Sequence, residues 1–230
     1  MELSPQEIDA IFLSIKVSIW SVVFSLLPAV YIAYILSRKN FWGRQALNVL
    51  VHIPLILPPV VTGYFLLILF SRTGLIGRFL DTYFGITVAF HWFGAVLAAA
   101  IMSFPLMVRA FRLGFESVDP KLEVVAYSLG ANRFMIFLTI TLPLVIPALI
   151  TGAVLGFAKS MGEFGATITF VSNIPGQTQT IPSAIFEFLQ IPGNNFMTIR
   201  LVCLSLLISI VALYISEVLA SRLSSREHSE

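Results

Sequence analysis

Five long apolar runs, separated by short segments that carry most of the charged residues, dominate the chain. The runs cover about residues 11–36, 47–70, 95–115, 134–159 and 197–220. A helix crosses the hydrocarbon core of a bilayer with about 20 predominantly apolar residues, so each run is long enough to span. The pattern predicts an all-α integral membrane protein with about five transmembrane helices, forming a single domain over residues 1–230.

The composition agrees with this pattern. Hydrophobic residues make up 57% of the chain, charged residues only 11%, and the mean hydropathy is +0.92, which excludes an ordinary water-soluble domain. The formal net charge of +2 is too small to indicate a nucleic-acid partner, so membrane lipid is the expected surrounding. Cys203 is the single cysteine and the three histidines are dispersed, so we expect no disulfide, no metal and no cofactor.

Basic residues gather in alternate connecting segments, and this asymmetry predicts the orientation. They follow the first run, extend from the end of the third run to the start of the fourth, and follow the last: Arg38, Lys39 and Arg44; Arg109, Arg112, Lys121 and Arg133; Arg222 and Arg226. Cytoplasmic loops carry an excess of Lys and Arg, so the N-terminus is expected outside and the C-terminus in the cytoplasm. In the alternative, the second and fourth runs are hairpins that do not cross, and basic clusters would face both sides.

A spaced pattern of arginine, prolines, threonine and glycine occurs twice, in residues 44–63 and again in residues 133–152. The first copy has Arg44, Pro54, Pro58, Thr62 and Gly63, and the second has Arg133, Pro143, Pro147, Thr151 and Gly152. Each copy is interpreted as an interfacial helix, a proline-bounded break and then a membrane helix. The alternative is that prolines are simply common near the ends of membrane helices.

The segment 116–143 has helical signals of its own although it connects two spans. Asp119 followed by Pro120 is typical of an N-cap and a first helical residue, and Gly130 is suited to a left-handed terminus. Between them, apolar residues recur at helical spacing: Leu122, Val125, Ala126 and Leu129. This predicts a short exposed helix with an apolar face. Few basic residues lie on it, which favours a protein partner over a lipid surface.

The stretch from Glu123 to Pro143 resembles the EAA loop of bacterial ABC-importer permeases. The resemblance marks these positions as contacts that couple the permease to an ATPase: Glu123, Ala126, Leu129, Gly130, Leu142 and Pro143. The family's acidic position falls on Val124 here, so Glu123 lies one place early. In such permeases this loop forms a coupling helix that sits in a groove of a cytoplasmic ATPase, and residues 119–143 are expected to do the same.

Further segments are similar to the oxyanion branch of this family, and specifically to molybdate permeases: residues 52–64, 98–110 and 159–185. The resemblance implies a type I importer bundle in the bacterial cytoplasmic (inner) membrane, with molybdate as its substrate and tungstate or sulfate as alternatives. It also implies a homodimer that encloses one path, two copies of a cytoplasmic ATP-binding subunit and one extracytoplasmic molybdate-binding protein. The chain has no G-x-x-x-x-G-K-[ST] motif, so the partner would hydrolyse ATP and this chain would not be an enzyme.

The stretch KSMGEFGATITF places two charges at the end of an apolar run. Lys159 and Glu163 are four residues apart and can neutralise one another on a helix, while Gly162 and Gly165 allow a break or a close approach to a two-fold mate. We interpret this segment as a gate beside the translocation path, formed by Lys159, Ser160, Gly162, Glu163, Gly165, Thr167 and Thr169. The alternative is an ion pair that only stabilises a helix end.

The next segment, VSNIPGQTQTIPSAIF, is expected to form a structured turn at the outer mouth. The hydroxyl and amide side chains expected to meet the arriving anion are Ser172, Asn173, Gln177 and Thr178. The alternative is an ordinary solvated loop.

Two other classes of function lack their motifs. An intramembrane enzyme needs a partner for Glu163 at helical spacing, and the sequence offers no Asp, His or Cys there. A passive channel needs a ring of like charge or a filter motif, and neither is present.

Overall fold

The structure is a computed structural model that describes residues 3–193 and 195–227, and every regular element in these residues is helical. Within this part of the chain, four helical stretches are long and apolar enough to cross a membrane: α1 (Pro5–Arg38), α5 (Trp92–Ser117), the stretch ending in α8 (Leu142–Met161), and α11 (Asn195–Glu227). A fifth span results if α2 (Arg44–Ile56) and α3 (Pro59–Phe70) are counted together. The prediction of an all-α membrane protein with about five spans is confirmed.

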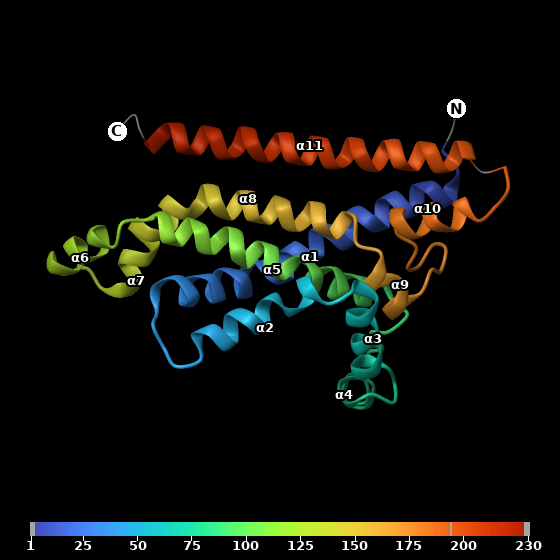
Figure 1. The fold of residues 1–230 in the computed structure, drawn as a ribbon, viewed down its shortest axis with the longest axis horizontal. Helices are drawn as coiled ribbons and strands as arrows, with labels where there is room; N and C mark the ends of the chain where they lie inside the picture. The colour runs from blue at the N-terminus through green and yellow to red at the C-terminus, as the bar shows by residue number, and fades with distance from the viewer. Residues whose placement is uncertain (1–2, 194, 228–230) are drawn as a thin grey trace.

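Short helices complete the fold: α4 (Leu75–Phe84), α6 (Pro120–Ser128), α7 (Arg133–Ile136), the π-helical turn η1 (Phe137–Thr141), α9 (Gly165–Val171) and α10 (Ile181–Leu189). Figure 1 shows α1, α5, α8 and α11 running side by side, with α6 and α7 at one end of the bundle. The N-terminus and α10 lie at the other end, and α3 and α4 project from the side. The segment with α6 and α7 and the segment with α10, which are predicted to face opposite sides, therefore lie at opposite ends.

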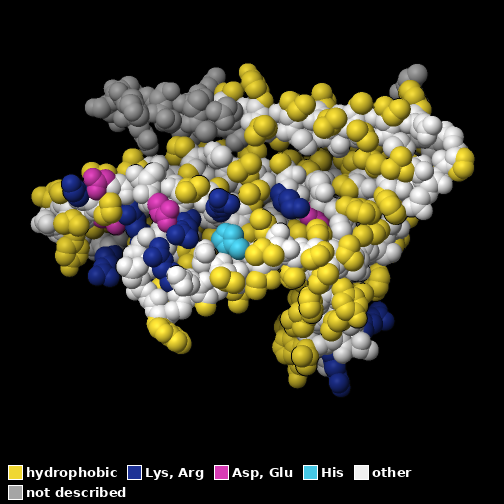
Figure 2. All heavy atoms as spheres, viewed as in Figure 1, with side chains coloured by type: hydrophobic (Ala, Val, Ile, Leu, Met, Phe, Trp, Pro, Cys, Tyr) yellow, Lys and Arg dark blue, Asp and Glu magenta, His cyan; other side chains and the backbone are white. Residues whose placement is uncertain are grey.

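Lys and Arg side chains gather at the end that carries α6 and α7 (Figure 2). We call this the basic end and define it by Arg38, Lys39, Arg44, Arg112, Lys121 and Arg133. Much of the remaining surface is hydrophobic, for example Leu27 on α1, which is 78% exposed. The apolar surface of the bundle suits contact with lipid tails. The charged residues at the basic end suit the polar interface of the bilayer.

Small residues bring the central helices together. Ala29 and Ala33 of α1 and Ala98 of α5 are fully buried, and α1 packs along α5. On α8, a Cβ at Gly156 would come within 2.7 Å of the Met107 side chain of α5. Lipid tails are as apolar as the helices, so burial of apolar surface does not drive helices together in a membrane. Small residues such as these alanines and Gly156 instead let the helix backbones approach closely and pack.

The apolar run 47–70 is not one straight helix. Leu57 and Pro58 have extended backbone angles between α2 and α3, and the two helices meet at a bend of 108°. The bend follows from the Pro58–Pro59 pair, because a proline disfavours helical angles in the residue before it. Pro59 then occupies the first turn of α3, where its missing N–H costs no hydrogen bond.

Candidate functional site

The segment interpreted as a gate is a second helix break. α8 ends at Met161, Gly162 and Glu163 follow outside it, and α9 begins at Gly165. Lys159 Nζ and Glu163 Oε2 are 2.9 Å apart, although Glu163 lies beyond the end of the helix that carries Lys159. The Glu163 side chain is 2% exposed and the Lys159 side chain 36% exposed. A buried carboxylate therefore sits beside a half-exposed ammonium.

Glu163 also starts the next helix. Its second oxygen, Oε1, accepts a hydrogen bond from the backbone N–H of Ala166 at 3.1 Å. Carboxylates are favourable at helix N-termini because they satisfy free N–H groups and complement the helix dipole. Both oxygens of Glu163 are engaged, one by Lys159 and one by α9, so this one side chain connects α8 to α9.

The remaining predicted gate residues use their polar groups inside the protein. Ser160 Oγ accepts a hydrogen bond from Ser21 Oγ of α1 at 2.7 Å. Thr167 Oγ1 donates to the carbonyl of Phe164 at 2.9 Å, and Thr169 Oγ1 donates to the carbonyl of Gly165 at 2.8 Å. These hydroxyls stabilise the break and the short helix that follows it.

The break between α2 and α3 lies against the break between α8 and α9. A Cβ at Gly165 would come within 2.7 Å of Pro59 Cβ, at the start of α3. A Cβ at Gly63 would come within 2.5 Å of the carbonyl oxygen of Ala166 in α9. The close approach that Gly165 allows is therefore to α3 of the same chain. A movement of α9 must involve α3.

The segment after α9 is a structured turn at the end opposite the basic end. Ser172 has a φ of +66° and Gly176 a φ of +72°. Thr178 is buried, accepts a hydrogen bond from the backbone N–H of Ile174 at 3.0 Å and donates to the carbonyl of Ser172 at 3.3 Å. Ser172 and Gln177 are exposed. Of the four side chains predicted to meet an anion, Thr178 already has its hydroxyl engaged within the turn.

Glu187 of α10 organises this turn and was not recognised from the sequence. Its Oε2 accepts hydrogen bonds from Asn173 Nδ2 at 2.6 Å and from Gln179 Nε2 at 2.5 Å. Asn173 Oδ1 is buried without a hydrogen-bond partner. A local pattern could not identify Glu187, because its two partners precede it by 8 and 14 residues in a segment without regular spacing.

The predicted exposed helix is present as α6. The Asp119 side chain accepts a hydrogen bond from Lys121 N at 2.9 Å, and Gly130 has a φ of +90°. No residue of α6 is buried, and its apolar side chains are exposed: Leu122, Val124, Val125 and Tyr127, with Leu129 directly after it. Asn132 caps α7 in turn, its side chain accepting from Met135 N. The arrangement leaves an apolar helix uncovered at the basic end.

Glu123 does not point away from the protein with the rest of α6. Its Oε1 lies 3.2 Å from Arg38 Nη2 at the end of α1 and accepts a hydrogen bond from Thr141 Oγ1 of η1 at 2.9 Å. Arg38 Nη2 also donates to the carbonyl of Val118 at 3.0 Å. Leu142 is half-buried and Pro143 exposed at the start of α8. The partner of Glu123 lies 85 residues earlier in the sequence, so spacing alone could not identify it.

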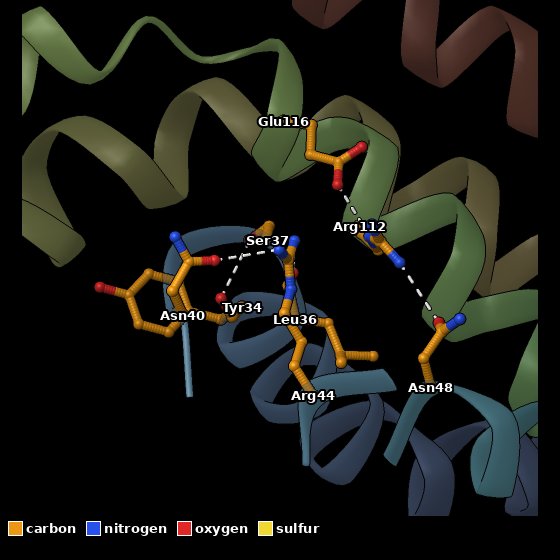
Figure 3. A network of polar contacts seen from close by, with 8 residues as sticks. All are labelled: Tyr34, Leu36, Ser37, Asn40, Arg44, Asn48, Arg112 and Glu116. Carbon is orange, nitrogen blue, oxygen red and sulfur yellow. Dashed lines mark hydrogen bonds and ion pairs between the residues drawn. The ribbon is translucent and has the colours of Figure 1, made fainter. Parts of the chain in front are cut away.

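Two further groups of polar contacts join distant helices. Arg200 of α11 contacts both carboxylate oxygens of the fully buried Glu7 of α1, with Arg200 Nε and Glu7 Oε1 2.8 Å apart. At the basic end, Arg112 of α5 donates to Glu116 Oε1 at 2.7 Å and to Asn48 Oδ1 of α2 at 3.2 Å (Figure 3). Figure 3 also shows Arg44 reaching back to the end of α1, where it donates to the carbonyl of Leu36.

The arrangement offers groups that bind and places where helices can move. Among the described residues, no group of three or more His, Cys, Asp and Glu side chains could hold a metal ion. Glu163 is paired with the Lys159 ammonium, and Glu187 accepts hydrogen bonds from two amide groups. Two apposed helix breaks in an apolar bundle provide places where the backbone can bend.

Comparison with known proteins agrees with this geometry. The family described as "Binding-protein-dependent transport system inner membrane component" matches residues 21–225. The molybdenum transport system permease protein ModB of Escherichia coli (strain K12) is 54% identical over 220 residues, which cover 96% of this chain and 96% of that protein. The ModB protein of Haemophilus influenzae is 50% identical over the same shares of both chains.

A solved structure has the same fold. It is a bacterial alginate ABC transporter in complex with an alginate pentasaccharide-bound periplasmic protein, with a TM-score of 0.76 and 17% sequence identity, covering 96% of this chain and 80% of the other. At this identity the likeness concerns the fold alone. The family match spans most of the chain, and the two relatives are 50% and 54% identical to it over 220 aligned residues. The chain therefore belongs to the family of inner-membrane components of binding-protein-dependent transport systems.

Proposed function

We propose that this chain is the translocating subunit of an ATP-driven importer that carries molybdate across the cytoplasmic membrane. The observation that carries the proposal is the identity of 54% and 50%, over nearly the whole length, to two molybdenum transport permeases. Tungstate and sulfate, which are also tetrahedral dianions, are the alternative substrates. The chain itself is a conduit and not an enzyme, because ATP hydrolysis belongs to a separate subunit.

The proposed assembly contains two copies of this chain, two cytoplasmic ATP-binding subunits and one extracytoplasmic molybdate-binding protein. The uncovered apolar helix α6 supports docking of the ATP-binding subunit at the basic end, because exposed apolar patches mark interaction sites. The turn at residues 172–180 is the proposed contact for the binding protein at the opposite end. Its two positive-φ positions give it a fixed shape of the kind that recognition requires.

The contacts of Glu123 suggest how movement of α6 reaches the membrane. Closure of the ATPase pair would displace α6, and Glu123 would transmit this displacement to α1 through Arg38 and to η1 through Thr141. η1 continues into α8, which ends at the break beside Lys159. Nucleotide then biases an equilibrium between two arrangements of the helix breaks, as expected for a two-state transporter.

In this proposal Glu163 holds the closed arrangement and does not bind the anion, which it would repel. Glu163→Gln keeps the side-chain shape but removes the charge that pairs with Lys159. We expect reconstituted transporter with this variant to assemble normally, to hydrolyse ATP at a raised basal rate and to take up little molybdate. If the variant hydrolyses the same number of ATP molecules per molybdate transported as the wild type, the Lys159–Glu163 pair only stabilises the helix end.

The test of the function is uptake of labelled molybdate by cells with and without this chain, with tungstate and sulfate as competitors. We expect uptake to require the chain, and tungstate to compete more strongly than sulfate. Uptake that is displaced by sulfate at equal concentration, but not by tungstate, would assign the chain to sulfate. Equal uptake in both strains would overturn the proposal.

A further inference from the structure

A cavity of about 350 Å³ lies between α2 and α5, near the basic end. It is lined by Asn48, His52, Arg109, Arg112, Leu113 and Glu116. None of these residues belongs to the helix break at residues 162–164, to the turn at residues 172–180 or to α6. The cavity combines two guanidinium groups with a single carboxylate, so its net charge is positive when His52 is neutral.

Arg112 is fixed in the wall of this cavity. Its guanidinium donates to Glu116 Oε1 at 2.7 Å and to Asn48 Oδ1 at 3.2 Å, as Figure 3 shows. A planar guanidinium has five N–H donors, so these two bonds leave donors for a further group. A cation held by two fixed partners needs little rearrangement to bind an anion.

Asn48 and His52 are also oriented by local hydrogen bonds. Asn48 Oδ1 accepts from Arg112, so the amide nitrogen of Asn48 keeps its two donors. His52 Nδ1 lies 2.7 Å from the Asn48 carbonyl, and since a carbonyl oxygen only accepts, this nitrogen carries the proton. Nε2 of the neutral ring is then a hydrogen-bond acceptor, so His52 shapes the cavity wall and the donors to an anion are Asn48 Nδ2 and the two guanidinium groups.

Arg109 differs from Arg112, because it has no hydrogen bond or ion pair within the described residues. It is exposed and lies about 12 Å along α5 from Ser117, given a rise of about 1.5 Å per residue. Arg109 thus lies near the end of α5 that adjoins the basic end, and an unpaired arginine of a membrane helix that lines a cavity commonly marks an ion pathway. In Figure 2, Lys and Arg side chains continue from the basic end over α5 and α8.

We infer that the cavity lined by Asn48, His52, Arg109 and Arg112 binds a tetrahedral oxyanion on its way to the cytoplasm. The inference rests on the proposed function for its place in transport. Guanidinium groups match oxyanions geometrically, because their paired N–H donors bind two oxygens at once. Glu116 neutralises part of the charge and keeps the site weak, as release requires, since conduction needs binding that an ion can leave.

Binding of labelled molybdate and labelled sulfate to the purified permease–ATPase complex, without the binding protein, tests the site. Arg109→Gln should weaken binding of both ions about tenfold, the loss expected for one charge-assisted hydrogen bond. Glu116→Gln should tighten binding about threefold, because it removes a like charge near the anion. Arg78→Gln is the matched control, since Arg78 is an exposed arginine on α4, outside the cavity. It should bind both ions as the wild type does.

Several outcomes would overturn the inference. If Arg109→Gln and Arg78→Gln bind both anions equally well, Arg109 only anchors α5 at the membrane surface. If Glu116→Gln weakens binding as Arg109→Gln does, the shape of the cavity matters and its charge does not. The site and the proposed function are separable: binding that follows the expected order in a complex that takes up no molybdate would support the site and refute molybdate transport.

Discussion

The two copies of the arginine, proline, threonine and glycine pattern take different shapes in the same chain. The first copy, residues 44–63, breaks completely, and α2 and α3 meet at 108°. The second copy, residues 133–152, passes from α7 through the π-helical turn η1 into α8 without such a bend. Equal spacing of residues therefore does not give equal backbone geometry.

The difference has a local cause. Pro58 is followed by Pro59, whereas the equivalent Pro147 is followed by Ala148. Pro59 disfavours helical angles at Pro58, and Pro58 disfavours them at Leu57, and these two successive residues are extended. In the second copy Pro143 and Pro147 are each followed by a non-proline residue, and the helical stretch continues past both. One residue decides between a bend and a continuous helix.

Converting the second copy to the first should have the largest effect. Ala148→Pro places a proline pair inside α8, where a proline costs about 3 kcal/mol or more. Ala148 also packs where a Cβ at Gly114 of α5 would lie, so a bend there separates α8 from α5. We expect little folded protein in detergent, measured by size-exclusion chromatography and thermal unfolding. Ala148→Ser, which keeps the N–H, should fold, and a stable Ala148→Pro protein would contradict the explanation.

The reverse change should have a smaller but specific effect. Pro59→Ala removes the restriction on Pro58 but keeps the Cβ that packs against Gly165. We expect α2 and α3 to straighten, so spin labels at Leu50 and Tyr64, both exposed, should move apart in electron resonance distance measurements. Pro54→Ala, inside α2, is the control and should leave the distance unchanged. An unchanged distance in Pro59→Ala would mean that packing of α3 on α9 fixes the bend.

The two equivalent glycines offer a finer comparison. A Cβ at Gly63 would lie 2.5 Å from a backbone oxygen of α9, whereas a Cβ at Gly152 would lie 2.5 Å from the ring of Phe111. Gly152→Ala should therefore lower stability by about 1–3 kcal/mol through overpacking of the core. Gly63→Ala should shift α9 and reduce molybdate uptake more than it reduces stability. Thermal unfolding measures the loss of stability and vesicle uptake measures the loss of transport in both variants. If the two variants lose stability and uptake in the same proportion, the two glycines have the same role.

The smallest expected change concerns the entry to the second copy. Gly130 has a φ of +90°, and a Cβ there would meet no atom within 4 Å. Gly130→Val therefore tests the backbone angle alone, at a cost of about 1 kcal/mol or more. We expect reduced ATPase association and uptake with normal membrane insertion, measured by copurification and transport. Gly130→Asn is the control, because asparagine accepts left-handed angles. If Gly130→Val keeps normal ATPase association and uptake, the left-handed turn at residue 130 has no role in coupling.

Local signals account for the elements that could be predicted. Asp119 and Pro120 start α6, and Gly130 adopts the left-handed angle that the sequence indicates. The Lys159–Glu163 pair forms because its partners are close in sequence. These features depend on a few neighbouring residues and their backbone preferences. The roles assigned to them as gate and coupling contacts stay predictions.

Features that depend on distant residues were out of reach. The pairing of Glu123 with Arg38 joins residues that no spacing rule relates. The bend at Leu57 and Pro58 was foreseen as a break, but its absence from the second copy depends on Ala148, which the repeated pattern does not include. The burial of Thr178 and the hydrogen bonds of its hydroxyl group follow from the fold of the turn, which the residue type alone does not indicate.

The ion pair between Glu7 and Arg200 has a consequence for how the protein is made. Its two residues are 193 positions apart, in the first helix and the last. During synthesis the first helix reaches the bilayer long before Arg200 leaves the ribosome. Until then, the Glu7 carboxylate lacks its arginine partner. Ionisable groups in membrane helices are costly until paired. The arrival of α11 therefore supplies the cation that pairs with Glu7, and a chain truncated before residue 200 would leave this carboxylate with its Ser4 hydrogen bonds alone.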